Sequence, residues 1–171
     1  MIHFDWGTAL LAFLTLQRIV ELWWARQNER RLLAAGGVEH GRSHFPLIVI
    51  LHAAWIIGLW ALAYDHSVNL LFLALVVILQ IARFWILATL GRRWTIRIIA
   101  VPGEKLTARG PYRFLRHPNY AVVAGEFAAV PLGLGLPTYA LVFSILNAAV
   151  LAIRIPEENA ALAAVAANQI R

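Results

Sequence analysis

The segment from Arg109 to Tyr120 concentrates the side chains of this chain that could do chemistry. Its twelve residues read Arg-Gly-Pro-Tyr-Arg-Phe-Leu-Arg-His-Pro-Asn-Tyr and stand directly before an apolar run. Pro111 and Pro118 fix the local backbone, and each restricts the residue before it. A rigid backbone beside a dense set of hydrogen-bond donors is suited to holding a polar ligand. The alternative is a basic loop that touches lipid phosphates.

Arg154 and Glu158 form a second candidate pair. They are four residues apart, which places them on one face of a helix. They either belong to a binding site or form an interfacial ion pair, and such exposed pairs contribute little to stability.

The composition indicates that lipid surrounds the elements that position these residues. The chain has 171 residues, 61% of them apolar and 14% charged, whereas soluble domains are about 45–50% apolar and about 25% charged. Its net charge of +6 comes from basic clusters between apolar runs, which is typical of a membrane protein and argues against nucleic-acid binding. There is no cysteine, so disulfides, a cysteine nucleophile and thiolate metal sites are excluded. We expect one domain, residues 1–171, with a cofactor-binding part from about residue 91 onward.

Five segments are candidates for membrane spans, which need about 20 residues of helix. They are Phe4–Trp24, Phe45–Tyr64, Leu70–Leu90, Tyr120–Leu136 and Tyr139–Ile153. We therefore predict an all-α integral membrane protein with about five transmembrane helices. Beyond them, Pro156 followed by two glutamates predicts the start of a separate C-terminal helix.

The basic residues predict an orientation with the N-terminus outside and the C-terminus inside. Of the 15 basic residues, only Arg18 and Arg83 lie within spans. The outer segments Met1–Asp5, Asp65–Asn69 and 134–138 hold no Lys or Arg, so the other thirteen are inside, as the positive-inside rule requires. They are Arg26, Arg30, Arg31, Arg42, Arg92, Arg93, Arg97, Lys105, Arg109, Arg113, Arg116, Arg154 and Arg171.

Several polar residues fall at membrane depth, where an isolated charge is costly. We expect Arg18 to pair with Glu21 and Arg83 to pair with Glu126, mainly in a structural role. Gln80 lies among them, and His52 is expected to be a hydrogen-bonded histidine of the bundle. His40 and His44 lack the carboxylate–histidine cluster that a metal site needs, so we predict no metal.

The motifs of the chain resemble those of the isoprenylcysteine carboxyl methyltransferase family. Members of this family are membrane enzymes that use S-adenosylmethionine. The resemblance rests on Gly110-Pro-Tyr112, Arg116-His-Pro-x-Tyr120 and Arg154-x-x-x-Glu158. Three further motifs resemble a bacterial branch that methylates alkylpyrones made by type III polyketide synthases: Arg18-x-x-Glu21-Leu, Glu39-x-Gly41-x-x-His44-x-Pro46 and Arg93-Trp-Thr-x-Arg97-Ile. The resemblance to the family covers the chain from about Arg18 to Leu162. Family members often continue with a tail that contains aromatic residues, whereas this sequence stops at Arg171.

The resemblance implies roles for individual residues. Arg154 would face and bind the methyl acceptor. His117 is the only obvious general base in the sequence, so we predict Arg154 and His117 as the catalytic residues. The cofactor S-adenosylmethionine would be bound by Glu104, Lys105, Leu106, Thr107, Tyr112, His117, Pro118, Asn119, Tyr120 and Glu158. The spacing from Arg154 favours Glu158 over Glu157 for the cofactor contact.

The same residue types suit this chemistry on physical grounds. The amino-acid end of the methyl donor needs an anion and hydrogen-bond donors, and its cationic sulfur suits aromatic faces. A cationic Arg154 would favour the ionised form of an acidic acceptor oxygen. We therefore predict an O-methyltransferase of a lipophilic enol, phenol or carboxylate in the bacterial inner membrane. Its site would face the cytoplasm, and its partners would be a lipophilic small molecule and membrane lipid, with no nucleic acid.

Other functions remain open at this point. An isoprenylcysteine carboxyl or a phospholipid N-methyltransferase is the closest alternative, although Arg154 would repel a cationic amine. An NADPH-dependent membrane reductase has similar C-terminal architecture. A non-catalytic membrane subunit, in which the polar residues serve packing alone, is the alternative from a different class.

Overall fold

The computed structural model describes residues 6–63, 66–104 and 106–167. Most of these residues form helices, namely α1 (Trp6–Ala34), α2 (Phe45–Ala63), α3 (Leu70–Leu90), α4 (Pro118–Gly133) and α5 (Pro137–Ala167). Between them lie the strands β1 (Val38–His40) and β2 (Ile98–Ala100) and the 3-10 turns η1 (Gly91–Arg93) and η2 (Gly110–Arg113). Five features of the sequence-based predictions fall outside the described residues: Met1–Asp5, Tyr64, Asp65, Lys105 and Arg171.

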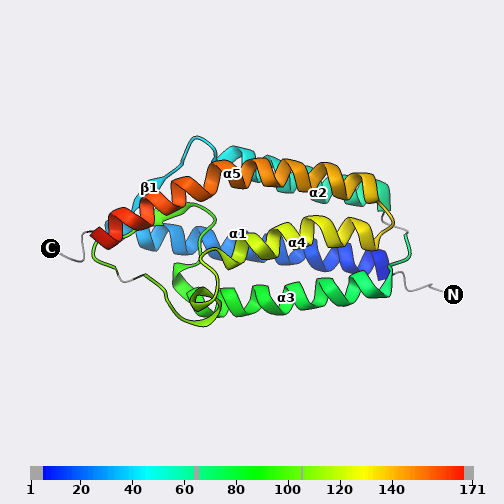
Figure 1. Ribbon diagram of the computed structural model, residues 1–171, viewed down its shortest axis with the longest axis horizontal. Helices are drawn as coiled ribbons and strands as arrows, with labels where there is room; N and C mark the ends of the chain where they lie inside the picture. Colours follow the sequence, from blue (N-terminus) through cyan, green and yellow to red (C-terminus); the bar gives the residue numbers. More distant parts are fainter. Residues whose placement is uncertain (1–5, 64–65, 105, 168–171) are drawn as a thin grey trace.

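The helices pack side by side as an elongated bundle (Figure 1). α4 lies between α3 and α5 and packs against both, while α2 packs against α1 and α5. The C-terminal end of α1, both strands, the segment 91–117 and the second half of α5 gather at one end, on the left in Figure 1. Residues that are far apart in the sequence therefore meet at this end of the bundle.

Local sequence explains where several helices begin and end. Asn69 caps α3 by accepting a hydrogen bond from the backbone N–H of Leu71 at 3.0 Å. Gly91 follows α3 with φ of +53°, a conformation that glycine adopts without steric cost. Pro118 and Pro137 stand at the first positions of α4 and α5, where the missing N–H breaks no helical hydrogen bond.

The two strands form a short antiparallel ribbon, in which Glu39 stands opposite Ile99. Arg97, just before β2, donates to Glu39 Oε1 at 2.5 Å and lies 3.6 Å from Glu29 Oε2 of α1. Its guanidinium also lies 4.3 Å from the ring centre of Phe45, at the start of α2. One arginine thus ties the ribbon to two helices. The prediction of an all-α protein missed this ribbon, because three-residue strands are too short to show an alternating pattern.

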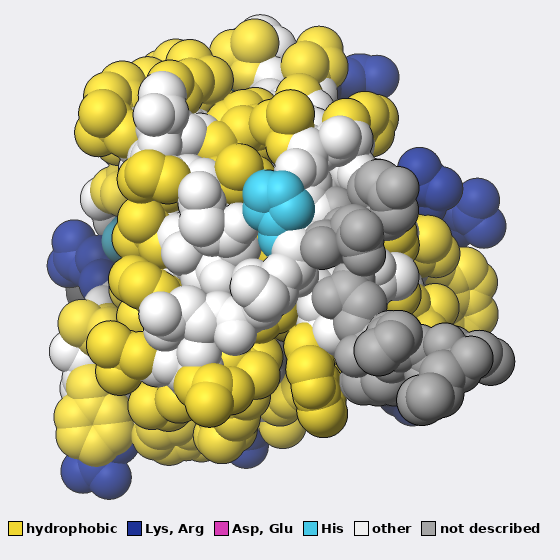
Figure 2. All heavy atoms as spheres, turned by 90° about the vertical axis from the view of Figure 1, so that its right-hand side faces the viewer, with side chains coloured by type: hydrophobic (Ala, Val, Ile, Leu, Met, Phe, Trp, Pro, Cys, Tyr) yellow, Lys and Arg dark blue, Asp and Glu magenta, His cyan; other side chains and the backbone are white. Residues whose placement is uncertain are grey.

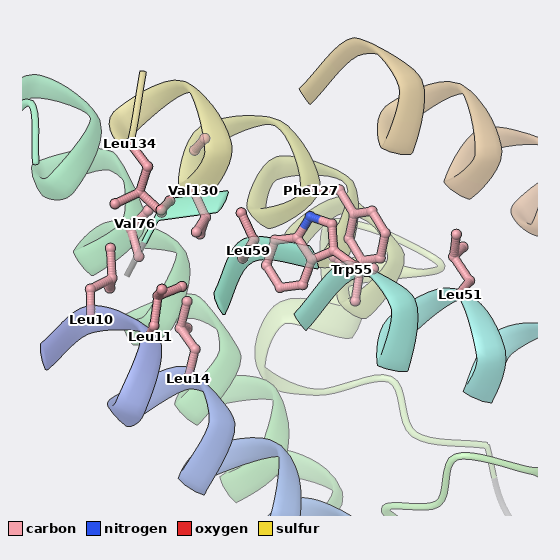
Figure 3. Close-up of a cluster of buried hydrophobic side chains, with 13 residues drawn as sticks. Leu10, Leu11, Leu14, Leu51, Trp55, Leu59, Val76, Phe127, Val130 and Leu134 are labelled. Atoms are coloured by element: carbon pink, nitrogen blue, oxygen red, sulfur yellow. The ribbon is translucent and has the colours of Figure 1, made fainter. Parts of the chain in front are cut away.

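The main apolar core fills the middle of the bundle (Figure 3). Trp55 of α2 and Phe127 of α4 are fully buried, and their rings stack with centroids 4.7 Å apart. Leu11 and Leu14 of α1 are also fully buried in this cluster, as is Val130 of α4. Tightly packed side chains from three helices therefore hold the bundle together and fix the end that carries the two strands.

A buried ionic network of Arg18, Glu21, Arg83 and Glu126 joins α1, α3 and α4. Glu21 lies 3.3 Å from Arg18 and 2.5 Å from Arg83. Glu126, which is fully buried, pairs with Arg18 and lies 3.3 Å from Arg83. The predicted pairs are confirmed, and each arginine also contacts the second carboxylate. Two amides complete the set, since Gln80 donates to Glu126 at 2.7 Å and Gln17 to Glu21 at 3.1 Å.

Three helices are long and apolar enough to cross a membrane, as far as the described residues go. They are Phe45–Ala63, Leu70–Arg93 and Pro137–Val165, with mean hydropathies of 2.1, 2.5 and 1.8. α1 carries charged residues in its second half, and the 16 residues of α4 span about 24 Å, less than the roughly 30 Å of a bilayer core. Five crossings and their orientation therefore stay predictions.

The surface of the bundle is strongly apolar. Figure 2 looks onto the end opposite the ribbon, where hydrophobic side chains cover much of the face. Among the described residues, Lys and Arg show only at the margins of this view. Large apolar side chains are also exposed along the helices, including Ile57 and Ile81 at 67% and 64%. Such surfaces are compatible with lipid contact rather than with water.

One sequence-based prediction about the C-terminal region is wrong. Pro156 does not begin a separate helix, because α5 runs through it from Pro137 to Ala167. A proline within a helix removes one backbone hydrogen bond. Arg154 and Glu158 stand on either side of Pro156, and both bind the hydroxyl of Tyr120 in α4. These contacts hold α5 against α4 across the proline, so α5 continues.

Candidate active site

A cavity of about 610 Å³ lies where α5, β2 and the segment 104–120 meet. This volume is in the range of small-molecule sites. Nine of the eleven predicted site residues line it: Glu104, Leu106, Thr107, Tyr112, His117, Asn119, Tyr120, Arg154 and Glu158. Pro118 is buried as the first residue of α4 and is not among the lining residues. Lys105 lies outside the described residues.

His117 stands at the entrance to α4, immediately before Pro118. Its Nε2 lies 3.0 Å from Asn159 Oδ1, and its Nδ1 lies 3.6 Å from Glu158 Oε1. The imidazole also stacks on the ring of Tyr120, with centroids 5.3 Å apart. Both ring nitrogens therefore face side chains of α5, and the histidine fixes the start of α4 to that helix.

The hydroxyl of Tyr120 joins the two predicted residues of α5. Arg154 donates from Nε to this hydroxyl oxygen at 2.7 Å, and the hydroxyl donates to Glu158 Oε2. Arg154 also donates from Nη2 to the backbone carbonyl of Ile96. Four residues apart on α5, Arg154 and Glu158 thus meet through a third group. Glu158 lines the cavity, whereas Glu157 is exposed and does not line it; the cofactor contact of Glu158 stays a prediction.

A second set of polar contacts fastens the loop that follows β2. Arg93 lies 2.5 Å from Glu104 Oε1 and donates from Nη1 to Thr107 Oγ1 at 3.3 Å. Both Glu104 and Thr107 line the cavity. Because both charged side chains are about one-third exposed, water screens this ion pair and it contributes little to stability. Its effect is to hold the loop against η1.

Tyr112 lines the same cavity from η2. Burial, and in second place the carboxylate of Glu158, raise the pKa of its phenol above the ordinary value of 10.0. Both causes disfavour the phenolate. Tyr112 therefore keeps its proton, and its hydroxyl stays available as a hydrogen-bond donor at neutral pH.

A second cavity, of about 370 Å³, lies among α1, α2, α4 and α5. Aliphatic side chains of these helices make up much of its wall, and Arg18 and His52 add polar groups. It shares five lining residues with the first cavity: Trp94, Thr95, Asn119, Tyr120 and Arg154. A cavity with a mixed polar and apolar lining and a more apolar one therefore meet at the same arginine and tyrosine, an arrangement that could bring a polar and a lipophilic reactant together.

Asn119 belongs to the wall shared by both cavities. Its Oδ1 is buried and has no hydrogen-bond partner among residues 6–63, 66–104 and 106–167. Buried acceptors normally have a partner, so this amide is a polar group of the wall that the described residues leave unsatisfied.

The sequence-based predictions missed several residues of the site. Asn159 follows Glu158 directly, and its position beside a predicted contact was a signal that could have identified it. Asn147, 3% exposed, lines the second cavity; it stands two helical turns before Arg154 and so on the same face. The contact of Arg154 with the carbonyl of Ile96 could not be predicted from the sequence, because every residue has a backbone carbonyl.

Comparison with known proteins places these residues in a family. The model of the isoprenylcysteine carboxyl methyltransferase (ICMT) family matches residues 71–164. Uncharacterized protein YpbQ of Bacillus subtilis (strain 168) is 39% identical over 158 residues, which cover 90% of this chain and 94% of the relative. An uncharacterized protein of Haemophilus influenzae is 26% identical over 152 residues, which cover 80% and 83% of the two chains. No solved structure matches the chain significantly.

Proposed function

Because the chain belongs to the isoprenylcysteine carboxyl methyltransferase family, we propose that it is an S-adenosylmethionine-dependent O-methyltransferase. Its acceptor is a lipophilic compound with an acidic oxygen: an alkylpyrone-like enol, a phenol or a carboxylate. The family implies a membrane methyltransferase, and the three apolar helices agree with a membrane protein. The observation that carries the proposal is the Tyr120 hydroxyl, which links Glu158 in the first cavity to Arg154 in the wall of both.

The residues of the first cavity fit the methyl donor. Glu158 supplies an anion for its amino group, and Asn119 Oδ1 is an unpartnered acceptor in the shared wall. The rings of Tyr112 and Tyr120 offer π faces to a cationic sulfur, and Leu162 belongs to the apolar part of the lining that would suit adenine. When bound, S-adenosylmethionine supplies a methyl group already activated by the sulfonium charge.

Arg154 is the residue we assign to the acceptor. Tyr120 and the carbonyl of Ile96 hold two of its nitrogens, so its orientation is set before a ligand binds. A fixed cation beside the acceptor oxygen lowers the pKa of that oxygen and favours its ionised, nucleophilic form. An acidic enol or carboxylic acid then needs no strong general base.

His117 has a positioning role in this proposal. Its ring nitrogens face Asn159 and Glu158, which keeps the carboxylate of Glu158 directed into the first cavity. The apolar lining of the second cavity limits water around the acceptor. Alignment and exclusion of water are the main contributions that the protein makes to such a displacement.

The two cavities suggest separate routes for the two reactants. We propose that the water-soluble donor enters from the cytoplasmic face of the bacterial inner membrane. The acceptor then reaches the second cavity sideways from the bilayer, between helices. A cationic phospholipid amine is a poorer acceptor, because Arg154 would repel it; a prenylated cysteine carboxylate meets the same chemical requirements as the preferred acceptors.

Calorimetric titration of the purified, detergent-solubilised protein with S-adenosylhomocysteine tests the proposal, with NADPH as the parallel titrant. We expect saturable binding of S-adenosylhomocysteine that weakens about tenfold or more in Glu158→Gln and His117→Ala. Glu157→Gln is the matched control, because it makes the same change on an exposed neighbour outside the cavity. Binding of NADPH instead would indicate a reductase, and binding of neither would leave a non-catalytic subunit.

A further inference from the structure

Phe114 and Leu115 are large apolar side chains that the fold leaves uncovered, with 69% and 54% of their surface exposed. They stand where the 3-10 turn η2 ends, and both of their backbone N–H groups donate to the carbonyl of Pro111 at 3.1 Å. Arg113 and Arg116, on either side of them, are also exposed. The four residues 113–116 therefore form one surface, here called the η2 surface, in which two apolar side chains lie between two cations.

The end of α3 gives the level of this surface along the bundle. η2 packs against α3 (Figure 1), and a Cβ on Gly110 would collide with the side chain of Thr89 in the last turn of that helix. Trp85 is 50% exposed and precedes Thr89 by four residues, about 6 Å along the helix axis. Exposed tryptophans of an apolar helix such as α3 are typical of the boundary between hydrocarbon and headgroups. The η2 surface is therefore level with the headgroups.

The η2 surface also carries an excess of positive charge. In the part of the chain that the structure describes, no carboxylate pairs with Arg113 or Arg116, whereas Arg93 of the adjacent turn η1 is paired with Glu104. The guanidinium of Arg113 lies 5.2 Å from the ring centre of Phe114, so charge and apolar surface are directly side by side. Basic residues at the edge of a membrane are attracted to anionic lipid headgroups, which makes such lipid the partner that complements this surface.

We infer that the η2 surface docks on anionic lipid. Phe114 and Leu115 insert at the boundary between headgroups and acyl chains, where large apolar side chains are buried, and Arg113 and Arg116 bind lipid phosphates. All four residues also line the first cavity, so lipid headgroups form part of the rim of that cavity. The inference requires a membrane protein but does not depend on the proposed reaction.

Spin labels on single cysteines test the insertion, because the chain contains no cysteine of its own. Leu115→Cys reports on the η2 surface, Ile81→Cys on an exposed position in the middle of α3, and Glu157→Cys on an exposed charged position of α5. In nanodiscs of mixed phosphatidylcholine and phosphatidylglycerol, we expect the Leu115 label to collide with oxygen more often than with a water-soluble nickel complex, as the Ile81 label does and the Glu157 label does not.

Two results of this experiment would overturn the inference. A Leu115 label with the collision pattern of the Glu157 label would show that the η2 surface lies in water. A Leu115 label shielded from both reagents would show that protein covers the surface, either another part of this chain or a second copy.

The preference for anionic headgroups has its own test. In nanodiscs of phosphatidylcholine alone, the ratio of oxygen to nickel collisions at the Leu115 label should fall about threefold or more. Arg113→Gln combined with Arg116→Gln should lower it similarly in mixed nanodiscs. Arg30→Gln combined with Arg31→Gln is the matched control, since it removes two exposed charges from α1 outside the first cavity, and it should leave the ratio unchanged.

An unchanged ratio in neutral nanodiscs would overturn the role of anionic lipid. This comparison of two kinds of nanodisc uses one protein, so it stands alone should a double variant not fold.

Discussion

Arg154 donates a hydrogen bond from Nε to the phenolic oxygen of Tyr120 across 2.7 Å, which joins the middle of α5 to the first turn of α4. The same hydroxyl donates to Glu158. One oxygen atom therefore orients both the residue assigned to the acceptor and the residue assigned to the donor. Its removal should affect both functions.

Tyr120→Phe is expected to weaken binding of S-adenosylhomocysteine about tenfold, because Glu158 loses a hydrogen-bond donor to its carboxylate. Isothermal titration of the detergent-solubilised variant measures the change. Tyr139→Phe is the matched control, since its hydroxyl donates to the carbonyl of Trp55 at 2.9 Å and it lines neither cavity. Equal affinities in the two variants would refute the role given to Tyr120.

Arg154→Lys should separate binding from transfer. Lysine keeps the charge but cannot bind Tyr120 and the Ile96 carbonyl in the same fork, so the cation loses its fixed position. We expect methyl transfer from labelled S-adenosylmethionine into the lipid fraction to fall about a hundredfold, with affinity for S-adenosylhomocysteine within about threefold. Arg92→Lys, exposed and outside both cavities, should leave the transfer rate unchanged. A parallel loss of donor affinity would show that Arg154 acts on the donor instead.

Glu126→Gln is expected to destabilise the protein by about 3–5 kcal/mol, because it leaves Arg18 and Arg83 with a single carboxylate in buried surroundings. The midpoint of unfolding in detergent measures the effect. Glu157→Gln, on the exposed surface, makes the same chemical change and should shift the midpoint little. A small effect of both substitutions would mean that the network tolerates an unbalanced charge.

Gly58 leaves room for the hydroxyl of Tyr139, because a Cβ at this position would collide with that oxygen. Gly58→Ala should therefore destabilise the contact between α2 and α5 by about 1–3 kcal/mol. Removal of the hydroxyl in the double variant Gly58→Ala/Tyr139→Phe should recover part of the loss. A double-mutant cycle on unfolding free energies measures this coupling; strictly additive losses would contradict the collision.

The raised pKa of Tyr112 predicts a dependence of stability on alkaline pH. Above the ordinary value of 10.0, the unfolded chain loses the phenolic proton while the folded protein retains it, so stability falls as pH rises. Tyr112→Phe should remove this contribution and flatten the decline. Unfolding midpoints of both proteins at rising pH, with tyrosinate absorbance of the native state as a second readout, check the sign. A steeper decline in the variant would contradict it.

The buried ionic network could be predicted from the chain because its polar residues are unusual where they stand. Arg18, Glu21 and Glu126 interrupt apolar runs, and the cost of isolated charge at such places predicts that they pair. Pattern alone could not show that each arginine contacts both carboxylates, since this requires α1, α3 and α4 to be placed in space. The joining role of Tyr120 was hidden for the same reason.

Other features of the fold depend on contacts between distant segments, which rules based on neighbouring residues do not describe. Pro156 normally signals a helix start, but the contacts of Arg154 and Glu158 on either side outweigh the lost hydrogen bond. The pairing of Glu39 with Arg97 joins two motifs that are far apart in the chain, and neither motif alone indicates the other as its partner. Gly41 is likewise explained by packing, since a Cβ there would strike the ring of His44.

The two cavities share a wall that includes Asn119, Tyr120 and Arg154. This arrangement determines on which concentration scale such an enzyme would respond to each reactant. The donor of the proposed reaction would be measured in moles per litre of water and the acceptor in moles per mole of lipid, because the first cavity has a mixed polar and apolar lining and the second is mainly apolar. Diluting the acceptor with inert lipid at a constant total amount would then slow turnover, as in surface-dilution kinetics. The aqueous donor concentration that half-saturates the enzyme would stay the same. The lipid composition of the bilayer would therefore control the turnover rate without changing the affinity for the donor.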